Sequence, residues 1–206
     1  FNGTSNYILS SMDKENKSFK EVLRNAQKLG YAESNPSSDL NGDDVAAKLK
    51  ILSSLCFNSF LNKNIHVEGI KDIDKDDINY AKRLGFKIKL LGYAELIGKN
   101  IFQRVHPTLI RDDSYVGSID GVLNAVIIEG NPVGQSIIQG EGAGPAATTS
   151  ALISDISSIL RGNIKFPFSI SNKERKSLNF KQISERPFSA YFRFNVIDKP
   201  GVLSLS

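Results

Sequence analysis

Four carboxylates and one lysine lie within sixteen residues of the sequence GYAESNPSSDLNGDDVAAKLKIL, which spans positions 30 to 52. They are Glu33, Asp39, Asp43, Asp44 and Lys48. Carboxylates around a lysine can hold a ligand that carries an ammonium group, and a desolvated lysine can exchange a proton with a hydroxyl or carbonyl oxygen. The stretch therefore predicts a polar site for a small ligand, or else the solvated start of a helix.

The solvated alternative rests on the four-residue spacing of Asp44 and Lys48. Such a pair contributes only about 0.3–0.5 kcal/mol to an exposed helix. The apolar positions around the pair are Val45, Leu49, Leu52 and Cys56, with Ile51 and Leu55 widening the stripe to one side. At about 100° per residue, Lys48 points between these two apolar groups. We therefore predict that its ammonium group faces inward, where a charge must be paired with the acids.

A glycine-rich segment, QGEGAGPAATTS at positions 139–150, follows a predicted strand and precedes a predicted helix. Its glycines would let the backbone approach a phosphate closely at the start of that helix. The segment does not fit the G-x-G-x-x-G fingerprint, because Pro145 stands where the third glycine would be and no acid follows at the end of a second strand. On spacing alone, a tight turn between strand and helix is the simpler interpretation.

Other polar residues give weaker signals. Asn2, Gly3 and Thr4 lie at a predicted helix start, where they could cap the helix or contact a ligand. His66 and His106 are isolated from each other and from further metal-ligand side chains, which favours structural imidazoles. We predict no metal site.

The composition argues against several other functions. The 26 basic and 22 acidic side chains give a net charge of +4 and are scattered along the chain, without the basic stripe of a nucleic-acid-binding protein. No apolar run reaches the roughly 18 residues needed to cross a bilayer, and no signal-peptide pattern opens the sequence. The expectation is a cytoplasmic protein without a nucleic-acid or membrane partner. The single cysteine, Cys56, falls on the apolar stripe and is expected to be buried and inert.

The periodicity of the sequence predicts an α+β fold in which a mixed sheet is covered by helices. Helices are expected over residues 5–12, 18–30, 43–58, 74–85 and 148–162, and strands over residues 65–70, 86–96, 101–110, 121–130 and 135–140. A polar, lysine-rich segment at 169–188 is expected to be a linker. Residues 189–198 alternate like a half-buried strand, with Phe192, Phe194 and Val196 on one face.

Several sequence segments, taken in order along the chain, indicate a protein family more specifically than any one segment does. The pieces are FNGTSNYIL, AQKLGYAESNPSSDLNGDDVAAKLKIL, RVHPTLI, GSIDGVLNAVIIEGNPVG and GEGAGPAATTSALISDI. Together they resemble the substrate-binding and catalytic region of homoserine dehydrogenases, over about residues 1–168. The later sequence FRFNVIDKPGVLS resembles the opening of an ACT regulatory domain, which has a ferredoxin-type fold. The expected organisation is a catalytic and dimerisation domain at 1–168, a linker at 169–188 and the start of a truncated ACT domain at 189–206.

The resemblance implies an activity and roles for the acidic stretch. The activity is the reversible, NAD- or NADP-dependent interconversion of L-homoserine and L-aspartate 4-semialdehyde, in threonine, methionine and isoleucine biosynthesis. By motif position, Lys48 would be the catalytic general acid/base. Glu33 and Asp44 would bind the substrate, Asp39 would support the same pocket, and Thr4 would line the cleft.

The resemblance also implies cofactor contacts and partners. Gly3, Gly30 and Gly144 would approach the NAD or NADP cofactor. In the family, a Rossmann domain, a metal-binding loop and a second active-site lysine precede the region that is matched, so residues 1–206 alone are expected to show no turnover. A homo-oligomer, dimer or tetramer, is expected, with threonine as a possible ligand of the ACT domain. The alternative is a non-catalytic module for oligomerisation or amino-acid binding.

Overall fold

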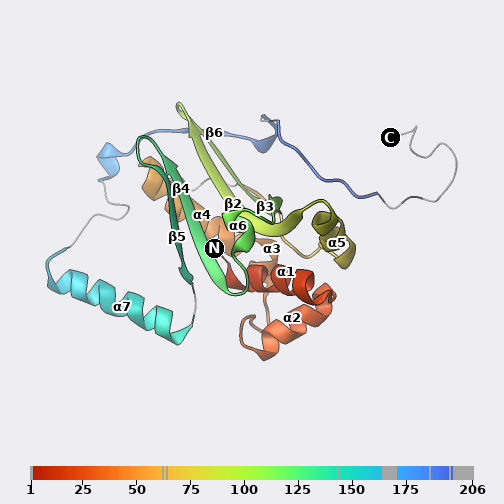
Figure 1. Ribbon diagram of the computed structural model, residues 1–206. Coiled ribbons are helices and arrows are strands. Elements are labelled where there is room, and N and C mark those ends of the chain that lie inside the picture. The colour runs from red at the N-terminus through yellow and green to blue at the C-terminus, as the bar shows by residue number, and fades with distance from the viewer. Residues whose placement is uncertain are drawn as a thin grey trace.

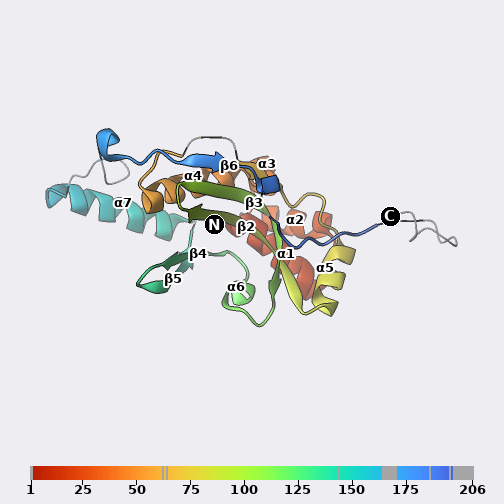
Figure 2. The same cartoon turned by 90° about the horizontal axis from the view of Figure 1, so that it is seen from above.

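The computed structural model describes residues 2–61, 63, 65–142, 144–163, 171–185, 187–194 and 196. A mixed sheet carries most of the helices, while a separate β-hairpin and one long helix extend to the side of this unit (Figure 1). Seen from above, the hairpin lies on one side of the sheet and helix α4 (Asp43–Phe57) packs on the other side (Figure 2). The predicted α+β class with a mixed sheet is confirmed.

The helices of the main unit are α1 (Gly3–Glu15), α2 (Phe19–Lys28), α3 (Ser37–Asn41), α4 (Asp43–Phe57) and α5 (Lys75–Arg83). Local caps define three of their starts, because the side chains of Asn2, Ser18 and Asp74 accept hydrogen bonds from backbone N–H groups of the first turn. The predicted helices α1, α2, α4 and α5 are confirmed. The short α3 is an addition within a stretch expected to be a loop, and it ends at Gly42, whose φ of +87° favours glycine.

The central sheet is built on the antiparallel pair β2 (Phe86–Ile97) and β3 (Asn100–Arg111). β1 (His66–Val67) and β6 (Asn179–Lys181) both pair with β3 in parallel. The predicted strand at 65–70 is therefore only two residues long, since the chain then turns so that the N–H of Ile70 donates to Leu40 O at 2.8 Å. The predicted linker contains β6, flanked by the 3₁₀ helices η2 (Asn172–Glu174) and η3 (Ile183–Glu185).

The core lies between the sheet and the helices. A Cβ atom at Gly92 of β2 would lie 3.1 Å from Val45 Cγ1 and 3.4 Å from Leu49 Cδ1, so glycine lets α4 approach the sheet closely. The core includes Ile8, Leu9, Met12, Val22, Val45, Leu49, Ile70, Ile78, Ile88, Leu90 and Val105. This packing fixes the starts of α1 and α4 relative to β2 and β3.

The hairpin and the last long helix stand apart from this core. After α6 (Tyr115–Ser118), β4 (Leu123–Gly130) and β5 (Gly134–Glu141) form their own antiparallel sheet. α7 (Pro145–Leu160) buries none of its residues and exposes Leu152, Ile153, Ile156 and Ile159. Figure 1 shows α7 apart from the other helices. No helix of the described residues is long and apolar enough to span a bilayer.

The prediction that Cys56 is buried is wrong, because its side chain is exposed. Val45 and Leu49 occupy the buried face of α4 as expected, but the second half of the helix turns a different residue toward the sheet. Ser53 is buried there, and its Oγ accepts a hydrogen bond of 2.9 Å from the Gln103 amide of β3. A polar contact with the sheet therefore replaces the end of the predicted apolar stripe.

The prediction of a half-buried strand at 189–198 is not confirmed by the described residues 189–194 and 196, which form no strand. Arg193 instead bonds the acidic start of α5, with 2.6 Å to Asp74 and 3.0 Å to Asp77. Phe192 and Phe194, expected on the buried face, are 72% and 71% exposed. Ion pairing thus turns the polar face of this segment inward. Residues 195 and 197–206 of the expected ACT segment lie outside the described residues.

Candidate functional site

The side chain of Asn2 joins two of the predicted site residues. Its Nδ2 donates to Asp39 Oδ1 at 2.6 Å and to Asp44 Oδ2 at 2.9 Å. Lys48 Nζ donates to the same Asp44 oxygen at 2.8 Å. We call these four residues, Asn2, Asp39, Asp44 and Lys48, the carboxylate–lysine cluster. The structure therefore brings Asp39, Asp44 and Lys48 together, as predicted.

The first turn of α1 holds the loops that carry the cluster. The Oδ1 of Asn2 accepts a hydrogen bond of 2.7 Å from the N–H of Ser5, so both ends of this amide are used. Ser5 Oγ donates to Asp39 O at 2.9 Å, and Thr4 Oγ1 donates to Tyr31 O at 2.7 Å. Thr4 therefore supports the loop from a buried position.

The cluster favours an ionised carboxylate at Asp44. Partial burial would raise the pKa of Asp44, but hydrogen bonds from Lys48 and Asn2 outweigh burial and hold that pKa below its ordinary value. An ionised Asp44 can attract a cationic ligand and keep Lys48 oriented.

Lys48 is more exposed than the predicted inward direction implies. Its side chain is 47% exposed, and Ile51 and Leu55, on the same side of α4, are 51% and 40% exposed. The sheet covers only the opposite side of the helix. The predicted widening of the apolar stripe toward Ile51 and Leu55 is therefore wrong for the part of the chain described, and Lys48 lies at the edge of the cluster.

The other predicted residues lie outside the cluster. Glu33 is exposed, and its backbone carbonyl accepts a hydrogen bond of 3.1 Å from Gln27 Nε2. Gly30 and Gly144 have φ of +75° and +102°, and apart from the adjacent residues no described atom lies within 4 Å of a Cβ atom built on either. A Cβ atom on Gly3 would lie 3.0 Å from Val122 O, so this glycine permits close packing.

The histidines make local hydrogen bonds. His106 Nδ1 lies 2.7 Å from Pro107 O, and burial lowers the pKa of this imidazole. His66 Nε2 lies 2.6 Å from Glu68 Oε1. Within the described ranges, no group of three His, Cys, Asp or Glu side chains could hold a metal ion.

A cavity of about 550 Å³ adjoins the cluster, between β2 and β4. Asn2 belongs to both its lining and the cluster. The polar part of the lining includes Asn6 and Lys89, while Leu91 and Ala125 belong to the apolar part. The cluster thus lies at the edge of a space large enough for a small ligand.

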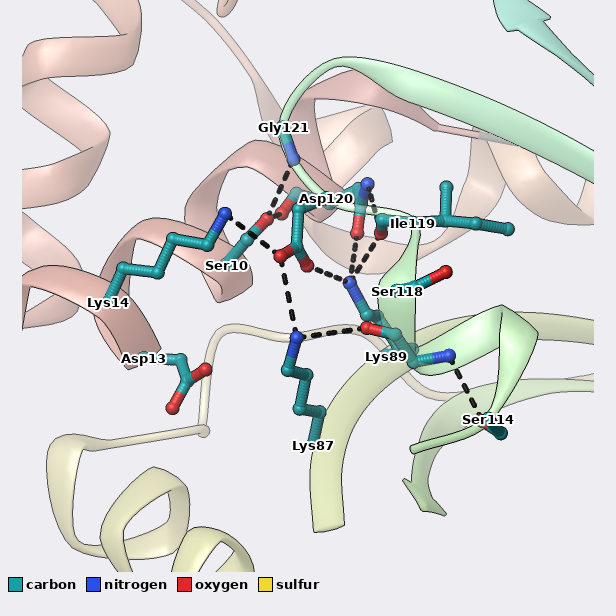
Figure 3. Close-up of polar contacts among 12 residues, drawn as sticks. Ser10, Asp13, Lys14, Lys87, Lys89, Ser114, Ser118, Ile119, Asp120 and Gly121 are labelled. Atoms are coloured by element: carbon teal, nitrogen blue, oxygen red, sulfur yellow. Dashed lines mark hydrogen bonds and ion pairs between the residues drawn. The ribbon is translucent and has the colours of Figure 1, made fainter. Parts of the chain in front are cut away.

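A buried lysine that sequence reasoning missed secures α1 beside this cavity (Figure 3). Lys89 Nζ donates to Asn6 Oδ1 at 2.9 Å, to Ile119 O at 2.6 Å and to Asp120 Oδ1 at 2.9 Å. Asn6 lies one helical turn after Asn2, so this contact fixes the helix that orients Asp39 and Asp44. The available signal was the alternation of Lys87 and Lys89 with Ile88 and Leu90, which places two lysines on one face of the strand.

The carboxylate of Asp120 is surrounded by cations. Lys14 lies 2.9 Å and Lys87 3.4 Å from Asp120 Oδ2, in addition to Lys89 on the other oxygen. Burial alone would raise the pKa of Asp120, but the hydrogen bonds and charges of these lysines lower it from 3.8 to about 2. Burial lowers the pKa of Lys89.

This arrangement predicts an acid-sensitive contribution to stability. Because the pKa of Asp120 is lower in the folded state, its contribution is complete above about pH 4 and is lost as the pH falls toward 2. Between pH 5 and pH 2.5, the wild-type protein should lose on the order of 1–2 kcal/mol more unfolding free energy than Asp120→Asn. Urea unfolding at the two pH values measures this difference, and equal losses would contradict the assignment.

The fold and the cluster define a helix-covered α+β domain with a carboxylate–lysine site. The family model described as homoserine dehydrogenase matches residues 1–157. The chain therefore belongs to the homoserine dehydrogenase family.

Curated relatives and solved structures agree with this membership. A homoserine dehydrogenase of Helicobacter pylori is 43% identical over 204 residues, which cover 98% of this chain and 48% of the relative. That of Neisseria gonorrhoeae is 39% identical over 209 residues, with the same coverage of both chains. The chain spans about half the length of the curated relatives it matches.

Two solved structures extend the comparison to the fold. The crystal structure of a homoserine dehydrogenase from Thiobacillus denitrificans matches with a TM-score of 0.83 and 36% identity, over 88% of this chain and 44% of that one. A hyperthermophilic archaeal homoserine dehydrogenase mutant, in complex with NADPH, matches with a TM-score of 0.61 and 25% identity, over 78% of this chain and 46% of that one.

Proposed function

We propose that the carboxylate–lysine cluster is the substrate site of a homoserine dehydrogenase that interconverts L-homoserine and L-aspartate 4-semialdehyde. The observation that carries the proposal is Asn2, which holds Asp39 and Asp44 together beside Lys48. Both substrates carry an ammonium group, and paired carboxylates are suited to bind it.

In this proposal Lys48 moves the proton of the reaction. Bound NADH or NADPH, which Gly30 and Gly144 would contact, would supply the hydride that reduces the aldehyde carbon of the semialdehyde. Lys48 donates a proton to the carbonyl oxygen as the C–O double bond becomes a single bond, which yields the homoserine hydroxyl. In the reverse direction the neutral amine of Lys48 accepts the hydroxyl proton.

The remaining predicted roles stay proposals. Glu33 would bind the substrate from the neighbouring loop, and Thr4 supports that loop through Tyr31 O. Gly30 and Gly144 would contact the cofactor, which agrees with the open space around both glycines. Gly3 lies at the start of the helix that lines the cavity. The preference for NAD or NADP stays open.

The exposed side of Lys48 suggests what completes the site. Ile51 and Leu55 flank this lysine with large exposed apolar surfaces, 51% and 40%. In the whole protein we expect a nucleotide-binding domain to cover this side, which would desolvate Lys48 and bring the nicotinamide to the substrate.

Assembly and regulation are further parts of the proposal. The exposed apolar side chains of α7 support pairing with another copy or another domain, since large exposed apolar patches mark interaction sites. Residues 189–206 would belong to an ACT domain that could bind threonine, which is supported only by the resemblance of FRFNVIDKPGVLS to the opening of such a domain. Location in the cytoplasm stays a prediction.

Substrate analogues test the proposed ammonium recognition. The whole protein that contains this chain should oxidise L-homoserine with NAD or NADP, with a kcat/KM about 10²-fold higher than for 4-hydroxybutanoate, which lacks the amine. Asp39→Asn should reduce this preference, because a neutral amide replaces one carboxylate. Equal use of the two alcohols, or no oxidation of homoserine, would refute the proposal.

A further inference from the structure

A second cavity, of about 240 Å³, lies between the central sheet and the segment that follows β6. Its lining consists of Tyr93, Phe102, Gln103, Arg104, Lys181, Pro187 and Phe188. Tyr93 also lines the larger cavity beside Asn2, while Arg104, Lys181 and Phe188 belong only to the second one.

Arg104 is the unusual member of this lining. Its guanidinium carbon lies 5.5 Å from the ring centroid of Tyr93 and 5.3 Å from that of Phe188. Its Nε is buried and has no hydrogen-bond partner. Two other arginines show the usual pairing, since Arg111 lies 2.7 Å from Asp113 and Arg193 lies 2.6 Å from Asp74. Within the described residues, Arg104 has no such carboxylate.

The two rings stabilise the positive charge of Arg104 but supply no acceptor in its place. Cation–π contacts favour a guanidinium near an aromatic ring, yet its N–H groups still require oxygen atoms. These donors form a rigid planar fork that matches the two oxygens of a carboxylate. The guanidinium of Arg104 is therefore positioned to bind a carboxylate, and the described residues supply none.

The other charged groups nearby already have partners. Lys181 Nζ lies 2.6 Å from Glu185 Oε2, and Tyr93 donates its hydroxyl to Glu95 Oε2 at 2.8 Å. The Lys181–Glu185 pair is neutral as a whole, so Arg104 sets the sign of the charge that the cavity lining offers.

We propose that Arg104, Tyr93 and Phe188 form a binding site for a small carboxylic acid with an apolar body. The carboxylate would bind the guanidinium of Arg104, and the apolar body would contact the aromatic rings and Pro187. The volume of about 240 Å³ limits the ligand to roughly the size of an amino acid or a short branched acid. The inference does not depend on the activity of the carboxylate–lysine cluster.

A set of matched ligands tests this site in the whole protein. Calorimetric titration with 3-methylbutanoate should give saturable binding with a Kd of about 1 mM or lower. The neutral 3-methylbutanol should bind at least about 10-fold more weakly, because it lacks the carboxylate. Inorganic phosphate tests the charge without the apolar body and should also bind more weakly than the acid.

Variants assign the binding to Arg104. Arg104→Gln should weaken 3-methylbutanoate binding by at least about 10-fold. Arg111→Gln, which changes an exposed arginine on the same strand, should leave it unchanged. Unfolding transitions of both variants check that the fold is retained. Binding that is unaffected by Arg104→Gln, or no saturation in the wild type up to about 10 mM, would overturn the proposal. A crystal structure of the whole protein in which another domain or a second copy supplies a carboxylate to Arg104 would also overturn it.

Discussion

Replacing Lys48 with alanine should lower kcat for homoserine oxidation by about 10²–10⁴-fold, the range expected when a general acid/base is removed. The fold should survive, because the side chain is 47% exposed and its pair with Asp44 spans one helical turn. Such a pair contributes about 0.3–0.5 kcal/mol. Steady-state kinetics measure the loss, while thermal unfolding and size-exclusion chromatography check the fold and the assembly.

Two further variants distinguish proton transfer by Lys48 from the effect of its positive charge. Lys48→Arg keeps a cation but has a pKa too high to exchange a proton near neutral pH, so it should not restore kcat. Lys50→Ala removes a lysine from the same helix outside the cluster and should keep kcat. Unchanged turnover in Lys48→Ala, together with lost assembly, would instead support the alternative of a non-catalytic module for oligomerisation or amino-acid binding.

Replacing Lys89 with methionine should produce the largest loss of stability, about 3–5 kcal/mol of unfolding free energy. Its side chain is 6% exposed, and its ammonium group is bonded to Asn6, Ile119 O and Asp120. Methionine fills most of the space but removes the lysine donor from Asn6 Oδ1 and Asp120 Oδ1, while Ile119 O keeps its hydrogen bond of 3.0 Å from Asn6 Nδ2. Buried acceptors that lose their partners are costly. Urea unfolding of the variant and the wild type measures the difference.

An exposed ion pair provides the control for Lys89. Lys82 lies 3.3 Å from Asp13 with its side chain 63% exposed, so Lys82→Met should cost no more than about 1 kcal/mol. The double variant Lys89→Met/Asp120→Asn should recover part of the loss, because it removes a partly buried charge that has lost one of its cations. A cost below about 1 kcal/mol for Lys89→Met would mean that this contact does not secure α1.

Local signals were sufficient to predict most helices and the main strands. The helices expected from residues 18 and 74 do begin there, and the caps at Ser18 and Asp74 involve residues only two or three positions away, so the signal for each start is local. The pairing of β2 with β3 follows from two adjacent strand patterns joined at Gly98, whose φ is +61°. For the site, the four-residue spacing of Asp44 and Lys48 was enough to predict their contact.

Contacts between segments that are distant in the sequence could not be predicted from such local signals. The bridge from Asn2 to Asp39 and Asp44 joins residues 37 and 42 positions apart, and the sequence left open whether Asn2 caps a helix or contacts a ligand. It does cap the helix, and it also orients the two acids. The contact between Lys89 and Asp120 likewise depends on how β2 packs beside α1 and α6.

Tertiary contacts also explain two other predictions that the structure does not confirm, the buried face of residues 189–196 and the burial of Cys56. Alternation predicted which residues of 189–196 share a face, but the direction of that face is set by the acids at the start of α5, which bind Arg193. Periodicity placed Cys56 on the apolar stripe of α4, but the sheet contacts Ser53 through Gln103 instead. Periodicity defines faces, whereas tertiary partners decide which face is buried.

The distance between Lys48 and a bound substrate decides whether this lysine is the general acid/base. A crystal structure of the whole protein with L-homoserine and oxidised cofactor gives the distance from Lys48 Nζ to the substrate hydroxyl oxygen. We expect a hydrogen bond of about 2.6–3.2 Å, with the substrate ammonium group against the carboxylates that Asn2 orients. A substrate bound elsewhere, with Lys48 still turned toward solvent and beyond hydrogen-bond reach of that oxygen, would contradict it.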